Sequence, residues 1–359
     1  MAEHPLFQRI ERHRRRTGKV RDSVVSQAHG GGGKAMQDLV DDLILGAFDN
    51  PSLDLDEDQA RFSLADLAKH GDRLAFTTDS YVVKPLFFPG ADIGKLAVHG
   101  TVNDLAMAGA RPLYLSCALV LEEGLPISTL RTILGSMAEA ARESGVHIVT
   151  GDTKVVERGA ADGLFINTAG VGVIPAGVSP SARSIEPGDV LLVNGFLGDH
   201  GAAVVVARGD LQIEAEILSD SQPLHDLASA LVSEVPVHAL RDATRGGVAA
   251  VLNEWAMSSD VGIHIDATAL PVRPVVRGLC EVLGFDPLHL ANEGKLVAAV
   301  PEAHAARALE ILRAHPRGRD AVVIGHARAE PRGVVAMSTG FGGERIVALP
   351  IGEQLPRIC

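Results

Sequence analysis

The sequence predicts two α/β domains. Apolar runs typical of strands alternate with segments of helical periodicity, and a turn-rich stretch, "VSPSARSIEPGD" at 178–189, divides the chain near its middle. The length of 359 residues, with 46% hydrophobic residues and 38 glycines, suits two buried cores better than one. We therefore expect a domain boundary near residue 175.

The first predicted domain, residues 23–175, mixes helices and strands. Apolar residues recur at helical spacing in its helices, and one helix has Leu96, Val98 and Val102 on its apolar face. Continuous apolar runs predict the strands between the helices. In chain order we expect a helix at 35–48, a strand at 72–83, a helix at 94–110, a strand at 113–121, a helix at 127–145, and strands at 146–152 and 164–177.

The second predicted domain, residues 176–341, repeats this style. Its clearest helix has Val248, Val251 and Trp255 on one face. In chain order we expect a strand at 189–195, a helix that starts at 201–207, a strand and turn at 237–247, and a helix at 248–256. Residues 342–359 are expected to form a last strand at 345–350 and a mobile tail.

The charge balance argues against nucleic-acid and membrane partners. Asp and Glu number 45 against 33 Lys and Arg, which gives a formal net charge of −12 and no general attraction to phosphates or anionic lipid. No apolar run of about 20 residues could span a bilayer, and no secretory leader opens the chain. Three scattered cysteines suit a reducing compartment, so we expect a cytoplasmic protein.

Residues 1–22 form an arginine-rich arm that breaks the acidic balance. The segment "RIERHRRRTGKVRD" contains six arginines, at 9, 12, 14, 15, 16 and 21. The absence of interleaved aromatic residues favours a solvated, poorly ordered arm. An arm that docks on a partner is the alternative interpretation.

Four consecutive glycines in "HGGGGKA", residues 29–35, form a candidate phosphate-binding loop. Glycine lets backbone N–H groups approach a phosphate without hindrance from a Cβ atom. The loop is not a Walker A motif, because Ala28 and Ala35 stand where that motif needs Gly and Ser or Thr. A flexible linker is the alternative.

Acidic residues stand where apolar segments end or are interrupted. Asp79 follows "LAFTT", Asp152 follows "VHIVTG", Asp242 follows "VHALR", and the pair Asn103 and Asp104 interrupts a helix face. Carboxylates from different elements can converge, and they then need a cation such as Mg²⁺ to relieve their repulsion. Four independent capping or turn-forming aspartates are the alternative.

Cys359 is the last residue of the chain, where a thiol cannot brace a core. A free thiol with a pKa of about 8.5 is partly ionised at neutral pH and can act as a nucleophile. Cys117 and Cys280 lie in apolar runs, and we expect them in the core. An inert surface cysteine is the alternative for Cys359.

Six segments together carry a resemblance to a known family. They are "HGGGGKAMQDL", "TTDSYVVKPLFFPGADIGKLAVHGTVNDLAMAGARPLYLS", "TGDTKVV", "RDATRGGVAAVLNE", "NEGKLV" and the terminal "PRIC". In these segments the chain resembles the HypE family of hydrogenase maturation proteins, the carbamoyl dehydratases, over residues 23–359. This family belongs to the aminoimidazole ribonucleotide synthetase-like ATP-binding superfamily. The resemblance implies a two-domain α/β fold in which the N-terminal domains of a homodimer pair into a β-barrel.

The resemblance also implies the roles of individual residues. It makes Cys359 the covalent carrier, with Lys154 and Glu293 beside it as a cation and a proton acceptor. It assigns Mg²⁺ to Asp79, Asp104, Asp152 and Asp242. The implied ATP-binding residues are Gly31, Gly32, Gly33, Lys34, Asp79, Asn103, Asp104, Gly151, Asp152, Thr153 and Asp242.

The activity that the resemblance implies gives the terminal thiol a purpose. ATP would phosphorylate the oxygen of a carboxamide carried on Cys359, and loss of phosphate would leave an S-cyanide for the iron centre of [NiFe] hydrogenase. The carbamoyltransferase HypF would be the carbamoyl donor, and a HypC–HypD complex would accept the cyanide. The alternatives are another ATP-using enzyme of the superfamily, such as selenophosphate synthetase, and a non-catalytic maturation scaffold. Selenophosphate synthetases place a reactive residue near the glycine loop, whereas residues 1–116 contain no cysteine.

Overall fold

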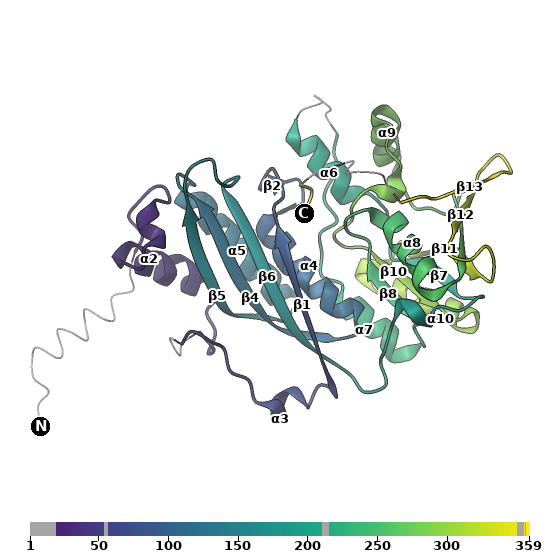
Figure 1. The fold of residues 1–359 in the computed structure, drawn as a ribbon, viewed down its shortest axis with the longest axis horizontal. Helices are drawn as coiled ribbons and strands as arrows, with labels where there is room; N and C mark the ends of the chain where they lie inside the picture. Colours follow the sequence, from purple (N-terminus) through teal and green to yellow (C-terminus); the bar gives the residue numbers. More distant parts are fainter. Residues whose placement is uncertain (1–18, 54–56, 210–214, 350–354, 356) are drawn as a thin grey trace, which may run out of the picture.

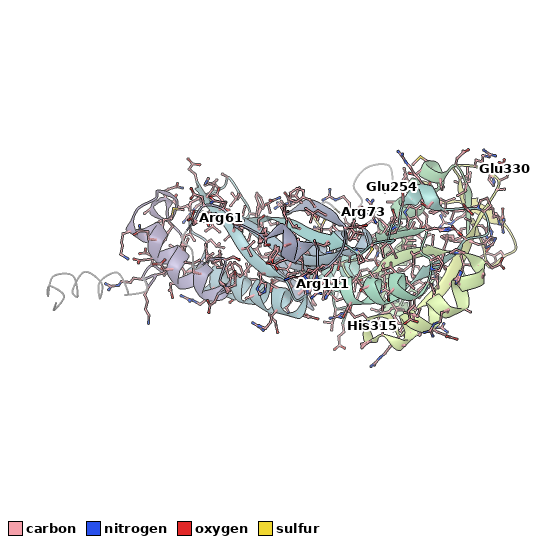
Figure 2. All side chains as sticks on the ribbon, turned by 90° about the horizontal axis from the view of Figure 1, so that it is seen from below. Arg61, Arg73, Arg111, Glu254, His315 and Glu330 are labelled. Atoms are coloured by element: carbon pink, nitrogen blue, oxygen red, sulfur yellow. The ribbon has the colours of Figure 1, made fainter. Side chains whose placement is uncertain are left out.

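A computed structural model describes residues 19–359 except 54–56, 210–214, 350–354 and 356. Two domains lie side by side along the long axis, each with its own sheet and core (Figure 1). The view from below shows the same arrangement, with Arg61 on the N-terminal domain and Glu330 at the far end of the C-terminal domain (Figure 2). The predicted mixed α/β, two-domain architecture is confirmed.

The N-terminal domain is built on an open four-stranded sheet. Its strand order is β1 (Arg73–Tyr81), β6 (Leu164–Ile174), β4 (Arg111–Glu122) and β5 (His147–Val156). Strand β6 is antiparallel to β1 and β4, whereas β4 and β5 are parallel. The remaining elements are η1 (Gln27–Gly30), α2 (Lys34–Leu39), η2 (Val40–Leu45), α3 (Leu64–Leu67), β2 (Phe87–Phe88), β3 (Ala91–Asp92), α4 (Ile93–Met107) and α5 (Ile127–Glu143). Strands β1 and β5 are therefore the two edges of the sheet.

Helix α4 forms the wall between the two domains. Asp92 caps its first turn, because the carboxylate accepts hydrogen bonds from the backbone N–H groups of Gly94 (2.7 Å) and Lys95 (3.1 Å). The helix is buried on nearly all sides, since it packs against β1 and β6 and also touches α7 (His225–Glu234) and β8 (Ala239–Asp242) of the C-terminal domain. Asn103 and Asp104 therefore lie where the domains meet.

The other face of the four-stranded sheet is uncovered by any described helix. Side chains alternate along a strand, so Thr77 and Tyr81 of β1 face α4 while Leu74 and Phe76 face away from it. Leu74 is 58% exposed and Phe76 is 72% exposed. An apolar sheet face of this kind usually requires a partner surface. Within the described residues of one chain the sheet does not close into a barrel.

The C-terminal domain contains a seven-stranded sheet. Its strand order is β13 (Glu344–Ile346), β12 (Val335–Ser338), β9 (Gly262–Asp266), β11 (Val322–Arg328), β7 (Val190–Val193), β10 (Leu296–Val300) and β8 (Ala239–Asp242). The helices are η3 (Ala182–Ser184), α6 (Asp199–Arg208), α7 (His225–Glu234), α8 (Gly247–Ser259), α9 (Pro274–Leu283), η4 (Pro287–His289), α10 (Glu302–Ala314) and η5 (Pro316–Gly318). Among the described residues, every helix is too short or too polar to cross a membrane.

Three predicted elements differ from the structure. The first helix, expected at 35–48, is α-helical only to Leu39 and continues as the π-helix η2. Strand β5 runs on past Asp152 to Val156, because its pairing with β4 continues through this polar stretch. The last strand, expected at 345–350, is the short hairpin strand β13. The expected burial of Cys117 and Cys280 is confirmed, at 5% and 2% exposure.

Candidate functional site

The end of the chain lies against the N-terminal domain rather than in solvent. Beyond β1, the N–H of Val82 donates to a terminal carboxylate oxygen of Cys359 (3.1 Å), and the N–H of Lys84 donates to the carbonyl oxygen of Arg357 (3.3 Å). Ile358 is 3% exposed and belongs to the core of the N-terminal domain. We call Arg357–Cys359 the docked tail. Its backbone hydrogen bonds and its buried side chain hold the terminal thiol in one position.

Cys359 is half-buried, and its thiol lies in a mostly acidic environment. A guanidinium nitrogen of Arg245, Nη2, donates to Cys359 Sγ at 3.3 Å. Burial raises the pKa of the Cys359 thiol to about 11, the nearby Glu293 carboxylate adds to the rise, and Arg245 opposes it. The docked thiol is therefore neutral at physiological pH and is a poor nucleophile.

Among the acidic residues, Glu293 raises the pKa of the Cys359 thiol most. Its backbone N–H donates to Asp220 Oδ1 (3.1 Å), and its carbonyl accepts from Asn103 Nδ2 (3.3 Å), so the loop is fixed from two sides. Its Oε1 atom is buried and has no hydrogen-bond partner among the described residues. Burial, and then the charge of Asp242, raise the pKa of Glu293 well above its usual range. This carboxyl consequently binds a proton tightly.

Three of the predicted carboxylates lie near one another. Asp79 lies near the end of β1, Asp104 lies on α4, and Asp242 is the last residue of β8. Burial raises the pKa of Asp242 to about 7 and Asp104 adds to the rise. Burial also raises the pKa of Asp104, with a further contribution from Asp79, although Thr77 Oγ1 donates to its carboxylate at 2.8 Å. We call Asp79, Asp104, Asp242, Glu293 and Cys359 the junction cluster.

The carboxylates of the junction cluster raise one another's pKa, and a bound cation would relieve this repulsion. Within the described ranges, no three His, Cys, Asp or Glu residues are arranged as a preformed metal site. Mg²⁺ commonly binds one or two carboxylates and takes its other ligands from water and nucleotide phosphates. The donor set of Asp79, Asp104 and Asp242 therefore suits a metal that arrives together with a nucleotide.

The remaining predicted residues lie at the opposite edge of the sheet. Gly31 to Lys34 connect η1 to α2, and η1 packs against β5. On β5, Lys154 Nζ lies 2.6 Å from the Asp152 carboxylate and lowers the pKa of Asp152. Asp152 and Thr153 line a pocket of about 260 Å³ together with apolar residues of α2 and η2. We call Gly31–Lys34 and Asp152–Lys154 the β5-edge group.

The four aspartates do not converge within one chain. Asp79 pairs with Thr168 on β6, which pairs with Cys117 on β4, which pairs with Gly151 on β5. Three strand spacings of about 4.8 Å separate the two edges, so Asp152 lies roughly 14 Å from Asp79. Lys154 lies on the same edge strand as Asp152, β5. The expected convergence is wrong for Asp152 and Lys154 in a single chain, because the order of strands in a sheet is not visible in the spacing of motifs.

Two predicted ATP-binding residues have structural tasks in this chain. Asn103 is 1% exposed, and its side-chain amide accepts from the N–H of Leu224 (2.7 Å) and donates to the carbonyls of Gln222 (3.1 Å) and Glu293. Gly151 lies so close to β4 that a Cβ atom would overlap the carbonyl oxygen of Cys117. Asn103 therefore positions the Glu293 loop, and Gly151 permits the close approach of two strands.

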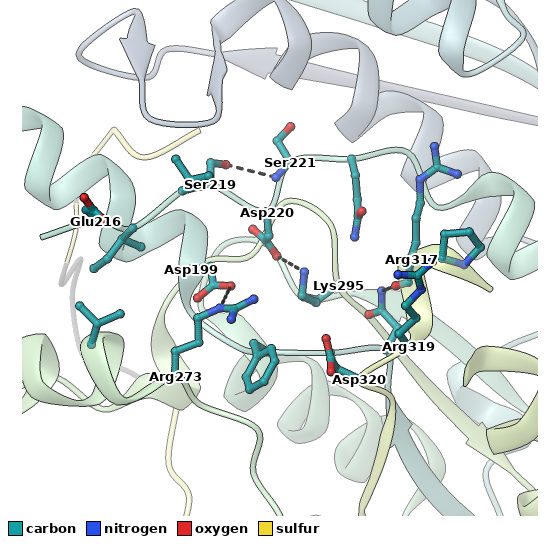
Figure 3. A pocket seen from close by; sticks show the side chains of 18 residues that line it. Asp199, Glu216, Ser219, Asp220, Ser221, Arg273, Lys295, Arg317, Arg319 and Asp320 are labelled. Carbon is teal, nitrogen blue, oxygen red and sulfur yellow. Dashed lines mark hydrogen bonds and ion pairs between the residues drawn. The ribbon is translucent and has the colours of Figure 1, made fainter. Parts of the chain in front are cut away.

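Sequence reasoning missed Arg245 and His200. Arg245 stands three residues after Asp242 in the turn "RDATRGG", where a cation beside a carboxylate was a usable signal. His200 is buried at the start of α6, next to Asp199, and nothing in its local sequence distinguishes it from a core histidine. Behind the Glu293 loop, Asp199, Asp220 and Lys295 line a second pocket of about 540 Å³ (Figure 3). In this pocket Lys295 Nζ lies 2.8 Å from Asp220.

Comparison with known proteins identifies the family. Residues 56–174 match AIR synthase related protein, N-terminal domain, and residues 186–338 match AIR synthase related protein, C-terminal domain. Carbamoyl dehydratase HypE of Rhodobacter capsulatus is 57% identical over 341 residues, which is 95% of this chain and 99% of that protein. This chain belongs to the HypE family.

Two solved structures of HypE proteins share the fold. The crystal structure of hydrogenase maturation protein HypE in complex with ATP matches with a TM-score of 0.87 and 50% identity, covering 93% of this chain and 99% of that one. A crystal structure of a HypE–HypF complex matches with a TM-score of 0.75 and 48% identity, over 87% and 99% of the two chains. The terminal cysteine and the junction cluster can therefore be interpreted within the HypE family.

The raised pKa of the docked thiol predicts slow alkylation of this HypE-family chain. Because the pKa is about 11, thiolate is scarce below that pH and the reactivity of docked Cys359 should rise up to it. A free Leu-Pro-Arg-Ile-Cys peptide should instead level off near pH 8.5. At pH 7.5 the protein should react with iodoacetamide more slowly than the peptide, by up to roughly two orders of magnitude, as followed by intact mass. Equal profiles would show that the tail spends its time undocked.

Proposed function

We propose that this chain is an ATP-dependent carbamoyl dehydratase that works on its own last residue. It converts a carboxamide on the Cys359 sulfur into an S-cyanide, which supplies the cyanide ligands of the iron centre during [NiFe] hydrogenase maturation. The observation that carries this proposal is the docked tail, because it sets the terminal thiol beside Glu293 and Arg245 in the junction cluster. Membership of the HypE family supports the reaction type.

The chemistry requires an oxygen atom to leave an amide. Water is a poor leaving group, so ATP transfers its γ-phosphoryl group to the carboxamide oxygen of Cys359–S–C(=O)NH₂ and leaves ADP. Removal of the two N–H protons and breakage of the C–O bond then release phosphate and leave Cys359–S–C≡N. The solved ATP complex of a HypE protein supports the choice of nucleotide.

The junction cluster supplies the proton acceptor, and Arg245 beside it supplies the charge that orients the substrate. Glu293 is the proton acceptor in its ionised form, which a cation bound at the neighbouring carboxylates would favour; its buried, unpartnered Oε1 then attracts a proton more strongly than an exposed carboxylate does. Arg245, which donates to Cys359 Sγ, orients the group carried on that sulfur. Asp79, Asp104 and Asp242 would hold Mg²⁺, which supplies positive charge for the phosphates of ATP.

A homodimer completes the site by joining the two edges of the sheet. The junction cluster lies at the β1 edge and the β5-edge group at the opposite edge. If the uncovered faces of two sheets pair into one barrel, β5 of one copy lies beside β1 of the other, with Leu74 and Phe76 facing the interior. Gly31–Lys34, Asp152, Thr153 and Lys154 of one copy then approach ATP and the docked tail of the other. This arrangement accounts for residues that are too far apart within one chain.

A heterodimer of two inactive chains tests the shared site. Lys154→Ala damages only the β5-edge group and Glu293→Gln only the junction cluster, so each homodimer should lose activity. Co-expression with two affinity tags yields the heterodimer, in which one of two sites is intact, and about half of wild-type dehydration per dimer should return. The amount of nitrile formed, measured by intact mass, gives the result.

The control for this experiment is a heterodimer in which one chain carries both substitutions and the other is wild type. It has no site in which both groups are intact if the site is shared, so it should stay inactive. Restored activity in this control, with none in the first heterodimer, would assign each site to a single chain. Sedimentation of the wild-type protein as a monomer at micromolar concentration would also contradict the shared site.

The reaction needs a partner that donates the carbamoyl group and a partner that accepts the cyanide. HypF is proposed as the carbamoyl donor, which is supported by the solved HypE–HypF complex. A HypC–HypD complex is proposed as the acceptor of the cyanide, and the cytoplasm as the place of the reaction. The donor is expected to meet Cys359 outside its docked position, because the raised pKa leaves little of the docked thiol as thiolate.

Turnover of the carbamoylated chain separates this function from a scaffold role. Carbamoylated protein incubated with ATP should lose one water per chain by intact mass, and it should release one ADP and one phosphate for each nitrile formed. A non-catalytic maturation scaffold would retain the carboxamide and consume no ATP. ATP consumption without loss of water would instead favour another reaction of the superfamily.

A further inference from the structure

The docked tail is held at a main-chain oxygen of each of its three residues. The carbonyl of Arg357 accepts from the N–H of Lys84 and from Arg208 Nη2 (2.9 Å), and the terminal carboxylate of Cys359 accepts from the N–H of Val82. The middle carbonyl, of Ile358, lies 2.8 Å from His200 Nε2. His200 and Arg208 both come from α6 of the C-terminal domain, whereas Val82 and Lys84 belong to the N-terminal domain. The tail is thus bound by both domains.

His200 is built to present one N–H group in a fixed direction. The side chain is 0% exposed, its Nδ1 lies 2.9 Å from Ser219 Oγ, and its ring meets the Phe88 ring edge-on with centroids 5.4 Å apart. A carbonyl oxygen can only accept, so Nε2 carries the hydrogen and Nδ1 accepts from the Ser219 hydroxyl. Ser219 is itself fixed, because its N–H donates to the carbonyl of Pro89 (2.7 Å).

The same N–H group lies within reach of the proposed proton acceptor. His200 Nε2 is 4.0 Å from Glu293 Oε1, which is beyond hydrogen-bond distance. Glu293 Oε1 is also the atom that lacks a partner within the described structure. The Ile358 carbonyl therefore takes the hydrogen bond that would otherwise be available to Glu293, so a docked tail leaves Glu293 Oε1 without a donor.

We propose that His200 is a positioning residue that holds the tail in its docked state through the Ile358 carbonyl and keeps its N–H group away from Glu293 while the substrate is in place. When the tail leaves to receive its carbamoyl group, the Nε2–H of the fixed His200 ring loses its acceptor, and a small movement of the Glu293 side chain from its distance of 4.0 Å lets Oε1 accept that hydrogen bond. Docking thus both delivers the substrate and frees the proton acceptor. The second part rests on the proposed function, whereas the first concerns only the tail.

Two similar substitutions of His200 test the tail contact. The amide nitrogen of glutamine can occupy the place of Nε2, whereas that of asparagine reaches only the place of Nδ1. Both residues are polar and smaller than histidine, but asparagine is one methylene shorter and leaves the larger cavity, so the effect of a buried His→Asn change needs its own control. His200→Asn should raise the rate of maleimide labelling at Cys359 about three- to tenfold, as expected for loss of one buried hydrogen bond. His200→Gln should label at a rate close to that of wild type.

His99 provides the matched control. It is also buried, and its Nδ1 lies 3.0 Å from the Oγ atom of Ser221, two residues after Ser219. It has no hydrogen bond to the described tail residues. His99→Asn should therefore leave the labelling rate of Cys359 unchanged. Thermal melting of each variant verifies folding, and Cys117 and Cys280 should stay unlabelled because they are buried.

Labelling and turnover together decide the outcome. Uptake of the carbamoyl group should be unchanged or faster in His200→Asn, whereas dehydration should slow by a smaller factor than the gain in labelling, because a tail that is mostly docked loses only a small share of its docked population. Equal labelling of folded wild-type, Asn and Gln proteins would overturn the proposal. Faster labelling in both variants would do so too, because glutamine should retain the contact. Since labelling needs neither ATP nor a partner, these results do not depend on the dehydratase activity.

Discussion

Replacement of Cys359 by alanine is expected to abolish both steps of the reaction. The variant should take up no carboxamide from the carbamoyl donor, and ATP should remove no water from it, because no other thiol is available. Cys117 and Cys280 are 5% and 2% exposed inside a strand and a helix, so neither can leave its position to meet a carbamoyl donor as a terminal residue can. Intact mass before and after each incubation measures both steps.

The fold of the Cys359→Ala variant should remain intact. The N–H of Val82 donates to a main-chain carboxylate oxygen of residue 359, which alanine also has. The buried Ile358 side chain is retained as well. Deleting residues 355–359 should also abolish the reaction, but it removes Ile358 from the core as well, so the point substitution is the cleaner test. A nitrile on sulfur in the Cys359→Ala protein would show that another residue carries the group.

Glu293→Gln is expected to slow dehydration by roughly 10²- to 10⁴-fold, the usual contribution of a positioned proton acceptor. Glutamine has nearly the same shape, and the backbone contacts with Asp220 and Asn103 do not involve the side chain that changes. Nucleotide binding should therefore persist. Single-turnover formation of nitrile from carbamoylated protein measures the loss, and equilibrium binding of ATP verifies that the site remains.

Glu216→Gln is a matched control for the removal of a negative charge. Glu216 lines the pocket of about 540 Å³ behind the Glu293 loop, and it is exposed. This variant should dehydrate its carboxamide at the wild-type rate. Normal turnover by Glu293→Gln would assign the proton to another group. An equal loss in both variants would indicate a general electrostatic effect instead.

Much of the fold could be predicted from local patterns. Apolar periodicity predicted most of the N-terminal elements within a few residues, and it predicted that Cys117 and Cys280 are buried. It did not distinguish the π-helix η2 from the α-helix that precedes it, because both keep the same apolar face. It also missed strands such as β10 and β11, which are short and lie inside the second domain.

The candidate site could be predicted only as a set of residue types. The positions of Asp79, Asp104 and Asp242 at the ends and interruptions of apolar segments indicated a shared site, and the structure brings these three together. The same reasoning failed for Asp152, because strand order places β5 at the far edge of the sheet. Asn103 was expected near phosphates, yet its amide is fully occupied by backbone groups.

The amino-acid sequence shows which groups the chain has: a terminal thiol, several carboxylates at element ends and a glycine loop. The packed structure adds that the thiol is docked, that its pKa is raised, that His200 meets the carbonyl of a residue 158 positions away, and that β1 and β5 are opposite edges of one sheet. Local patterns could not show these features, because such patterns depend on neighbours along the chain. Burial, strand order and long-range hydrogen bonds instead depend on which distant segments pack together, and these contacts set the pKa and the partner of each group.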